Sequence, residues 1–343
     1  MTFYQELQLN QAGSKAVIRN SQEKKDKFKH ILIYLFKIFI TVAFCTVFVM
    51  AFGKLFGSDN SIVGVVILLF VLSFRFADLG ISTNHAMLVL PVIFVILAIG
   101  PRLANSSGLL LEFLINVVCI MTLMILGCHN VLMFNHSTIL LGYLLLYGYD
   151  VTGDMYIKRL VAIFVGAVIT MVIYYIKHSK KTFKRSMQHL IEELDINSVR
   201  TRWQIRMALA ISTAILLAGI FNIPRRMWIG IAVMSVTMPF TDEIKQRSKG
   251  RIVGNIVGGI LFVIIYFALP ESMYSYIGII GGIGVGLSAT YGWQAIFNSL
   301  GAMSIAVSIL GFWQAIIFRI LNNAFGALYG ICFEKVCRKL RVE

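Results

Sequence analysis

Residues 31–53 read ILIYLFKIFITVAFCTVFVMAFG, an uninterrupted apolar run in which Lys37 is the only charged side chain. A helix needs about 20 mostly apolar residues to cross a bilayer, so this run is long enough to span one. Similar runs follow along the chain, and 58% of its 343 residues are hydrophobic while 14% are charged. Soluble domains carry roughly 25% charged residues, so this composition excludes a water-soluble enzyme. The sequence predicts an all-α, polytopic membrane protein.

The apolar runs fall into two sets of six. We expect the first six spans near residues 31–53, 60–75, 86–100, 108–127, 136–149 and 157–176. We expect six more near residues 205–221, 227–240, 252–269, 274–291, 293–310 and 312–333. Twelve spans of about 20 residues use about 240 positions and leave about 100 for tails and loops. The sum therefore favours about 12 spans.

These runs predict five segments along the chain. They are a basic cytoplasmic tail at 1–30, a first six-helix transmembrane repeat at 31–176, an amphipathic cytoplasmic connector at 177–203, a second six-helix transmembrane repeat at 204–334 and a basic cytoplasmic tail at 335–343. Apolar residues recur at roughly helical spacing in the connector, which predicts a helix there. Such a helix either lies against anionic lipid headgroups or has a regulatory or partner-binding role.

The distribution of basic residues indicates the orientation. With the amino terminus inside, 23 basic residues lie in inner segments and 6 in outer loops. This ratio satisfies the positive-inside rule for an even number of spans with both termini in the cytoplasm. We expect a multi-pass protein of the cell (plasma or inner) membrane. The net charge of +15 is explained in this way, so membrane lipid is an expected partner and nucleic acid is not.

Short motifs recur between the two sets, which is typical of an internal duplication. The matched pairs are Gly64 with Gly230, Phe76-Ala-Asp78 with Phe240-Thr-Asp242, and Arg159-Leu-x5-Gly166 with Arg319-Ile-x5-Gly326. Their offsets of 166, 164 and 160 drift smoothly, as small insertions would cause. Because each copy has six spans, we expect two parallel repeats related by a pseudo-two-fold axis along the membrane normal.

The most informative polar pattern is Arg-Ile-x-x-Asn-x-x-Gly, which occurs at residues 251–258 and 319–326, with a looser copy from residue 159. Spacings of four and seven place the arginine, asparagine and glycine on one helical face. We expect this face to bind an anionic substrate. The residues predicted to bind it are Arg319, Asn323, Arg251, Asn255 and Arg159.

A second interpretation of this pattern needs no substrate. Arg251 and Arg159 then snorkel from helix ends, and the glycines allow close helix packing. Arg319 fits this interpretation less well, because it lies about 10 Å inside its span, where a charge faces a bundle interior or a water-filled cavity.

Carboxylates are scarce within the apolar runs. Glu112 is the only clear case, so the apolar runs contain few of the residues from which a proton relay could be built. Asp78 and Asp242 lie at equivalent inner ends of spans. They either pair with Arg75 and Arg247 or are solvated loop charges.

Enzymatic signatures are absent from the sequence. It contains no H-E-x-x-H, no G-x-x-x-x-G-K-[ST] and no G-x-S-x-G, and its six histidines lack metal-ligand spacing. We therefore expect no enzymatic activity, no catalytic or metal-binding residue and no cofactor.

Several segments together resemble a known family. The two six-span units, the charged connector, residues 224–235 (PRRMWIGIAVMS) and residues 251–258 (RIVGNIVG) are similar to the fusaric acid resistance and aromatic acid exporter family, and more distantly to plant aluminium-activated malate transporters. The resemblance covers residues 205–333 well and 31–176 only weakly. It implies an efflux carrier or channel for organic anions, with Arg251 and Arg319 beside the translocation path.

This chain departs from the family pattern in two respects. Its connector has about 27 residues where many members carry a large cytoplasmic domain, and Pro91 stands near the place where the ninth span has Arg251. We predict efflux of small organic anions such as aromatic carboxylates, and leave homo-oligomer formation open. The alternatives are a non-transporting scaffold that recruits lipid or a soluble partner through the connector, and an intramembrane transferase or hydrolase.

Overall fold

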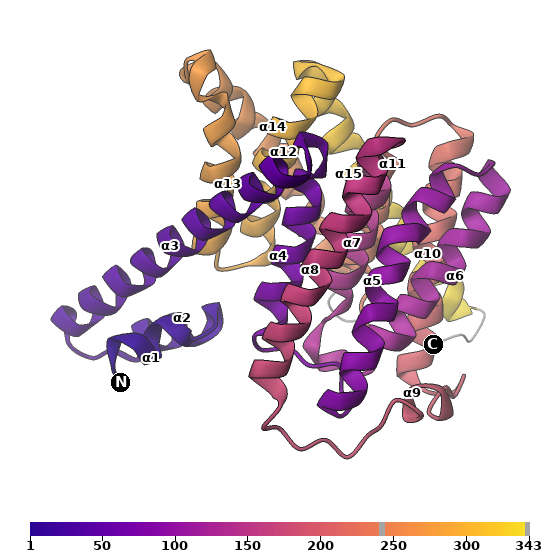
Figure 1. Ribbon diagram of the computed structural model, residues 1–343. Coiled ribbons are helices and arrows are strands. Elements are labelled where there is room, and N and C mark those ends of the chain that lie inside the picture. The colour runs from indigo at the N-terminus through magenta and orange to yellow at the C-terminus, as the bar shows by residue number, and fades with distance from the viewer. Residues whose placement is uncertain (240–243, 340–343) are drawn as a thin grey trace. The chain divides into compact units, whose positions relative to one another are not determined.

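The computed structural model describes residues 1–239 and 244–339, so Phe240 and Asp242 of the second motif copy lie outside the described residues. Within these ranges the regular elements are helices, α1 to α15 with short 3-10 turns (Figure 1). Eight of these helices are long and apolar enough to cross a membrane. The predicted all-α, multi-pass membrane fold is therefore confirmed, while the number of twelve spans stays a prediction.

Each predicted run contains one helix. The first set comprises α3 (Lys24–Phe56), α4 (Ser61–Phe74), α5 (Thr83–Asn105), α6 (Leu109–Gly127), α7 (His136–Gly148) and α8 (Asp154–His178). The second set comprises α10 (Val199–Ile220), α11 (Arg226–Val236), α12 (Ile244–Ala268), α13 (Ile277–Leu287), α14 (Tyr291–Leu310) and α15 (Phe312–Lys339). Helices satisfy their own backbone hydrogen bonds, which lipid cannot do. The tail adds α1 (Phe3–Gln8) and α2 (Gln11–Asn20).

Contacts group the chain into two units. Unit 1 comprises Met1–Val47 and Gly254–Ile316, and unit 2 comprises Phe48–Val253 and Ile317–Glu343. The helices α3, α12 and α15 therefore contribute residues to both units. This grouping differs from the two repeats expected from the sequence, whose boundaries stay a prediction.

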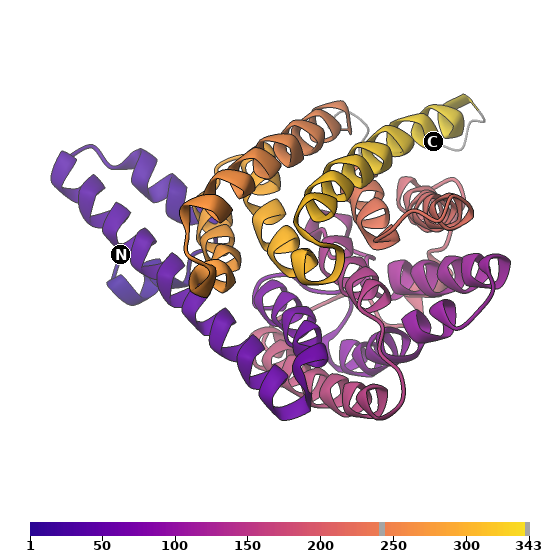
Figure 2. The ribbon, with the colours of Figure 1, turned by 90° about the horizontal axis from the view of Figure 1, so that it is seen from above.

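Unit 2 is built around the short helix α7. It packs against α4, α5, α6 and α11, and its residues Tyr143 and Leu144 are fully buried. The first helix of the second set, α10, packs along α6 and α11 (Figures 1 and 2). Unit 2 thus brings helices of both sets into one core.

The repeated glycines make equivalent contacts within unit 2. Gly64 on α4 approaches α3, where an added Cβ would lie 2.9 Å from the Phe52 Cβ atom. Gly230 on α11 approaches α10, where an added Cβ would lie 3.3 Å from the Ile215 Cδ1 atom. In each set the second helix therefore contacts the first through the matched glycine.

The sixth and second helices of each set show the same correspondence. Gly166 on α8 lies against the Ile67 side chain of α4. Gly326 on α15 lies against α11, where an added Cβ would be 2.6 Å from both the Ile229 carbonyl oxygen and the Ala232 Cβ atom. The predicted duplication stays a prediction.

The second helix of each set is short. α4 has 14 residues and α11 has 11, which correspond to about 21 Å and about 17 Å against a hydrocarbon core of about 30 Å. Non-helical residues 75–82 follow α4, and Ala77 and Leu79 among them are buried. In transporters, short segments at corresponding positions point to the binding site.

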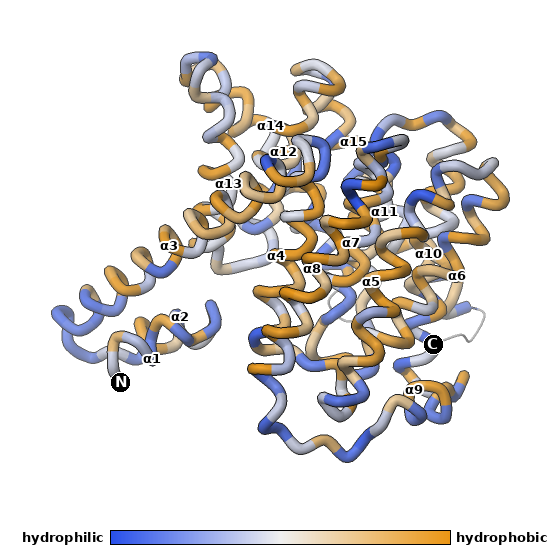
Figure 3. The backbone as a smooth tube through the Cα atoms, viewed as in Figure 1, coloured by the Kyte–Doolittle hydropathy of each residue, from blue (hydrophilic) through white to orange (hydrophobic). Residues whose placement is uncertain are grey.

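The connector is mostly not helical, which corrects the helix predicted over 177–203. α8 ends at His178, α9 comprises only His189–Glu192, and α10 begins after the Ser198 cap. On a helix, Lys180 would lie one turn from Lys184, and Lys181 would lie one turn from Arg185, so each pair of like charges would repel. Instead, the Ser82 amide donates a hydrogen bond to the Arg185 carbonyl at 2.8 Å. Figure 3 shows the hydrophilic connector leading to α9.

Candidate functional site

Arg319 lies beside the indole of Trp228 within unit 2. Its guanidinium carbon is 5.2 Å from the centroid of the Trp228 ring, and both residues are buried. The α15 helix supplies the arginine and the first turn of α11 supplies the tryptophan. A cation over an indole face is attracted by the ring quadrupole, which replaces part of the hydration that burial removes.

A second guanidinium, that of Arg225, shares the same indole. Its central carbon is 5.7 Å from the Trp228 ring centroid and 4.5 Å from the Tyr149 ring centroid. Its Nη1 atom donates a hydrogen bond to the Gly148 carbonyl at 3.3 Å. Arg225, Trp228 and Arg319, with Tyr149, form what we call the arginine–aromatic cluster.

The backbone that positions Arg225 is strained. Arg225 precedes α11 with φ +57° and ψ +45°, the left-handed region that non-glycine residues rarely adopt. The Asn322 amide on α15 donates hydrogen bonds to the Pro224 carbonyl at 2.8 Å and to the Arg225 carbonyl at 3.3 Å. α15 therefore holds the strained turn and, one turn away, carries Arg319.

Arg159 reaches the cluster from α8 through the backbone. Its Nη1 atom donates to the Tyr149 carbonyl at 2.6 Å, and its Nε atom donates to the Asn60 Oδ1 atom at 2.9 Å. Its Nη2 atom donates to the Asp59 carbonyl at 3.2 Å. All three nitrogen atoms of this guanidinium are thus bonded, and Arg159 ties the Tyr149 loop to the start of α4.

Glu112 pairs with Arg226. The Glu112 Oε2 atom accepts from Arg226 Nη1 at 3.0 Å, and the Tyr147 hydroxyl donates to the other oxygen. The guanidinium carbon of Arg226 also lies 5.8 Å from the Tyr147 ring centroid. The buried carboxylate therefore neutralises Arg226, the neighbour of Arg225.

Arg251 and Asn323 meet between α12 and α15. The Arg251 Nε atom donates to the Asn323 Oδ1 atom at 2.9 Å, and the Asn323 amide donates to the Arg319 carbonyl at 2.7 Å. Arg319 and Asn323 therefore lie one turn apart on α15, and Arg251 reaches Asn323 from α12. These are three of the five residues that the sequence pattern predicts to act together.

Asn255 belongs to unit 1. Its Oδ1 atom accepts a hydrogen bond from the Ser299 hydroxyl of α14 at 2.9 Å. Gly258, one turn further along α12, would carry a Cβ only 2.7 Å from the Ile296 carbonyl oxygen and 2.9 Å from the Ser299 Cβ atom. This end of the pattern thus serves the close packing of α12 on α14.

Asp78, which follows α4, pairs with Lys181 and not with Arg75, the partner considered from the sequence. Asp78 is buried and lies 3.9 Å from the Lys181 ammonium nitrogen, not beside Arg75. Arg75 instead lies over the Phe76 ring. The corresponding Asp242 lies outside the described residues.

Sequence reasoning missed Arg225, Trp228 and Tyr149 as site residues. Both Arg225 and Trp228 enter the sequence analysis only within residues 224–235, the segment that carries the family resemblance. A usable signal was present, because Pro224-Arg-Arg-Met-Trp228 places two cations just before a tryptophan at a helix start. Tyr149 carries no such signal, since its ring meets Arg225 only in the folded chain.

The described residues contain no group of three or more His, Cys, Asp or Glu that could hold a metal ion. What the arginine–aromatic cluster offers instead is positive charge from Arg225 at the start of α11 and from Arg319 within α15. Such charge suits the recognition of an anion, since charge-assisted hydrogen bonds to carboxylates are short and strong.

A comparison with known protein families supports the resemblance over part of the chain. Residues 213–333 match the family described as fusaric acid resistance protein-like, and this segment includes Arg225, Trp228, Arg251 and Arg319. No curated protein and no solved structure matches the chain. A membrane transporter is the class of protein that the family match and the apolar helices support. The chain is a multi-pass, all-α membrane protein whose segment 213–333 matches the model of the family described as fusaric acid resistance protein-like.

Proposed function

We propose that the protein transports small organic anions and that the arginine–aromatic cluster binds their carboxylate group. Arg225 holds the carboxylate, and Arg319 adds positive charge from the other helix that contacts Trp228. Aromatic carboxylates are the preferred substrates in this proposal, which the description of the family, resistance to fusaric acid, supports.

One observation carries the proposal. The Nε and Nη2 atoms of Arg225 are buried and, in the described part of the chain, have no hydrogen-bond partner. These two nitrogens form the edge of a guanidinium that a carboxylate binds with two parallel hydrogen bonds. A buried donor pair without acceptors costs free energy, which a bound carboxylate recovers.

The remaining predicted residues take supporting roles. Asn323 lies one turn beyond Arg319 on α15 and bonds to Arg251 of α12, and this pair would meet the anion further along its path. Arg159 positions the Tyr149 loop against which Arg225 stacks. Asn255 fixes the α12–α14 packing in unit 1.

Outward movement fits the physics of an anion. A cell interior that is negative favours anion exit by about 2.3 kcal/mol per charge per 100 mV. The scarcity of buried carboxylates is then tolerable, because export down this gradient needs no proton relay. We place the protein in the plasma or inner membrane with both termini in the cytoplasm.

The test is efflux of labelled benzoate and fusarate from proteoliposomes under an inside-negative potassium diffusion potential. We expect Arg225→Gln to slow efflux at low substrate by about 10-fold or more, since a charge-assisted hydrogen bond is worth about 1.5–3 kcal/mol. Lys158→Gln, which removes an exposed charge next to Arg159, is the matched control and should transport like wild type.

Two results would overturn the proposal. One is a folded Arg225→Gln protein that transports at the wild-type rate. The other is a wild-type protein that moves neither anion, which would favour the scaffold alternative.

A further inference from the structure

Unit 2 contains a cavity of about 460 Å³ that shares no lining residue with the arginine–aromatic cluster. It lies where the connector passes the loops that follow α4 and α6. Among its lining residues are Asp78, His129, Thr182, Lys184, Arg185 and Arg200. We call it the connector pocket.

Positive charge predominates in the connector pocket. Lys184, Arg185 and Arg200 line it, and Lys181 lies 3.9 Å from the lining acid Asp78. Glu193 provides the second nearby carboxylate, so four cations face two acids.

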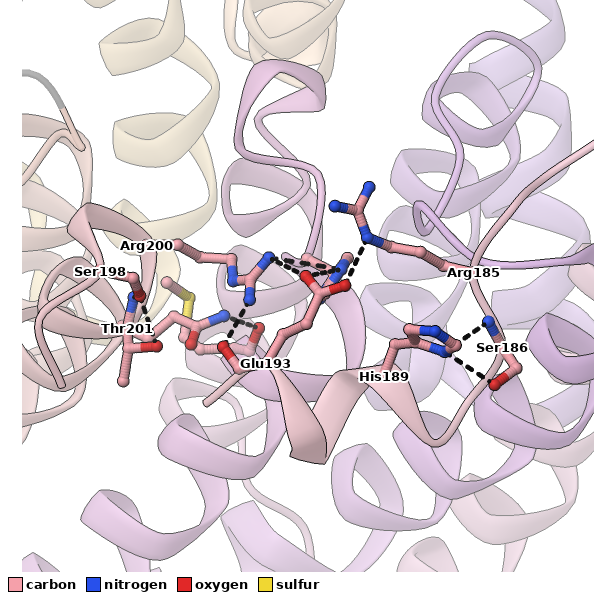
Figure 4. A network of polar contacts seen from close by, with 10 residues as sticks. Arg185, Ser186, His189, Glu193, Ser198, Arg200 and Thr201 are labelled. Atoms are coloured by element: carbon pink, nitrogen blue, oxygen red, sulfur yellow. Dashed lines mark hydrogen bonds and ion pairs between the residues drawn. The ribbon is translucent and has the colours of Figure 1, made fainter. Parts of the chain in front are cut away.

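Glu193 occupies only part of the available donors (Figure 4). Its carboxylate accepts from Arg185 Nε at 2.7 Å and from Arg200 Nη1 at 3.2 Å. Its backbone carbonyl accepts from Arg200 Nη2 at 2.7 Å. The two arginines are thereby held in fixed positions on either side of Glu193.

Donors remain beyond these contacts. Within the described residues, Nη1 and Nη2 of Arg185 and the ammonium of Lys184 make no hydrogen bond to protein atoms, and neither does the Thr182 hydroxyl. Thr182, Lys184 and Arg185 all line the connector pocket, so their donors border the same space. A single anion in that space could accept from more than one of them.

The neighbouring histidine does not add to this charge at neutral pH. His129 lies 3.3 Å from Glu193, and burial together with Arg200 lowers its pKa to about 4. The positive charge that attracts an anion to the pocket therefore comes from the lysine and arginine side chains, and not from His129.

The chemistry of the donors favours a phosphate group over a carboxylate. A phosphate monoester carries more than one negative charge and three terminal acceptor oxygens, whereas a carboxylate is satisfied by one guanidinium edge. The cavity volume lies within the range of small-molecule sites. The lining residue Leu132 is apolar and 69% exposed, as expected where a protein meets a lipid surface.

From these observations we propose that the connector pocket binds a terminal phosphate group, with more than one negative charge, through Lys184, Arg185 and Thr182. The group belongs either to an anionic lipid such as phosphatidate or to free phosphate. The bound group would brace the connector against residues 75–82, to which it is already tied by the Ser82–Arg185 hydrogen bond.

The test is isothermal titration calorimetry of the full chain in detergent. The probes are inorganic phosphate and water-soluble dihexanoyl phosphatidate, with benzoate as the carboxylate comparison. We expect Lys184→Gln/Arg185→Gln to weaken phosphate-group binding by about 10-fold or more. Lys177→Gln/Lys180→Gln removes the same charge from exposed positions outside the pocket lining and should leave binding unchanged.

The outcomes separate the two sources. If both probes bind and both lose affinity in the double variant, free phosphate suffices; if only phosphatidate does so, the ligand is a lipid headgroup. Binding that is equal in wild type and double variant, absent from wild type, or no tighter than that of benzoate overturns the proposal. Lys184→Gln alone leaves the Arg185–Glu193 contact intact and serves if the double variant does not fold.

Discussion

Arg251 on α12 donates a 2.9 Å hydrogen bond to Asn323 on α15, so a side-chain amide links two helices of the second set through a buried contact. The same amide donates to the Arg319 carbonyl one turn earlier. Asn323 therefore couples the position of one arginine to the backbone that carries another.

Replacing Asn323 should destabilise the protein. Asn323→Leu removes the acceptor of Arg251, and a hydrogen bond to a charged group is worth about 1.5–3 kcal/mol. We expect a lower melting temperature in detergent. Asn197→Ala, at an exposed position of the connector, should change the free energy of unfolding by less than about 0.5 kcal/mol. Equal melting temperatures for Asn323→Leu and wild type would contradict the coupling.

The ring of Tyr149 should matter for transport. Arg225 stacks 4.5 Å from the ring centroid, and a cation–π contact contributes about 0.5–2 kcal/mol. We therefore expect Tyr149→Leu to raise the KM for benzoate roughly 2- to 30-fold above that of Tyr149→Phe, which keeps the ring. Identical KM values for the two variants would show that stacking does not position Arg225.

A methyl group at Gly326 should force α15 away from α11. The added Cβ would lie 2.6 Å from a backbone oxygen of Ile229, which cannot move without moving the helix. We expect Gly326→Ala to lower stability by about 1–3 kcal/mol, measured by thermal unfolding. Gly301→Ala is the control, because an added Cβ at Gly301 meets nothing within 4 Å. The prediction fails if both alanines are tolerated equally.

Acid should weaken the fold through His129. Its pKa is lowered from 6.5 to about 4 by burial, so the unfolded chain takes up a proton at a higher pH than the folded chain does. The stability contributed by the neutral imidazole is fully present above pH 6.5 and is lost as the pH falls towards 4. Melting temperatures measured across this range should fall more steeply for wild type than for His129→Gln, and parallel curves would refute the assignment.

The positions of the helices were largely predictable because apolar length alone places them. The expected run 108–127 corresponds to α6 at Leu109–Gly127, and 293–310 corresponds to α14 at Tyr291–Leu310. The helix predicted for the connector was wrong. Its apolar spacing is helical, but like charges four residues apart and the contact of Arg185 with Ser82 favour an extended chain.

The candidate site was predictable only in part. Helical spacing places Arg319 and Asn323 on one face, and they do lie together with Arg251. The same spacing groups Asn255 with Arg251, yet Asn255 bonds to Ser299 in the other unit. Periodicity describes one helix at a time, whereas a site depends on which neighbouring helix each side chain meets.

The left-handed backbone of Arg225 sets stability against activity at a single position. Glycine adopts φ +57° freely, so Arg225→Gly would relieve strain of order 1–3 kcal/mol while deleting the guanidinium that the proposed site needs. A screen for heat-resistant variants of this protein would then enrich glycine at position 225 and return inactive molecules. Thermal selection and substrate selection should thus pull this residue in opposite directions.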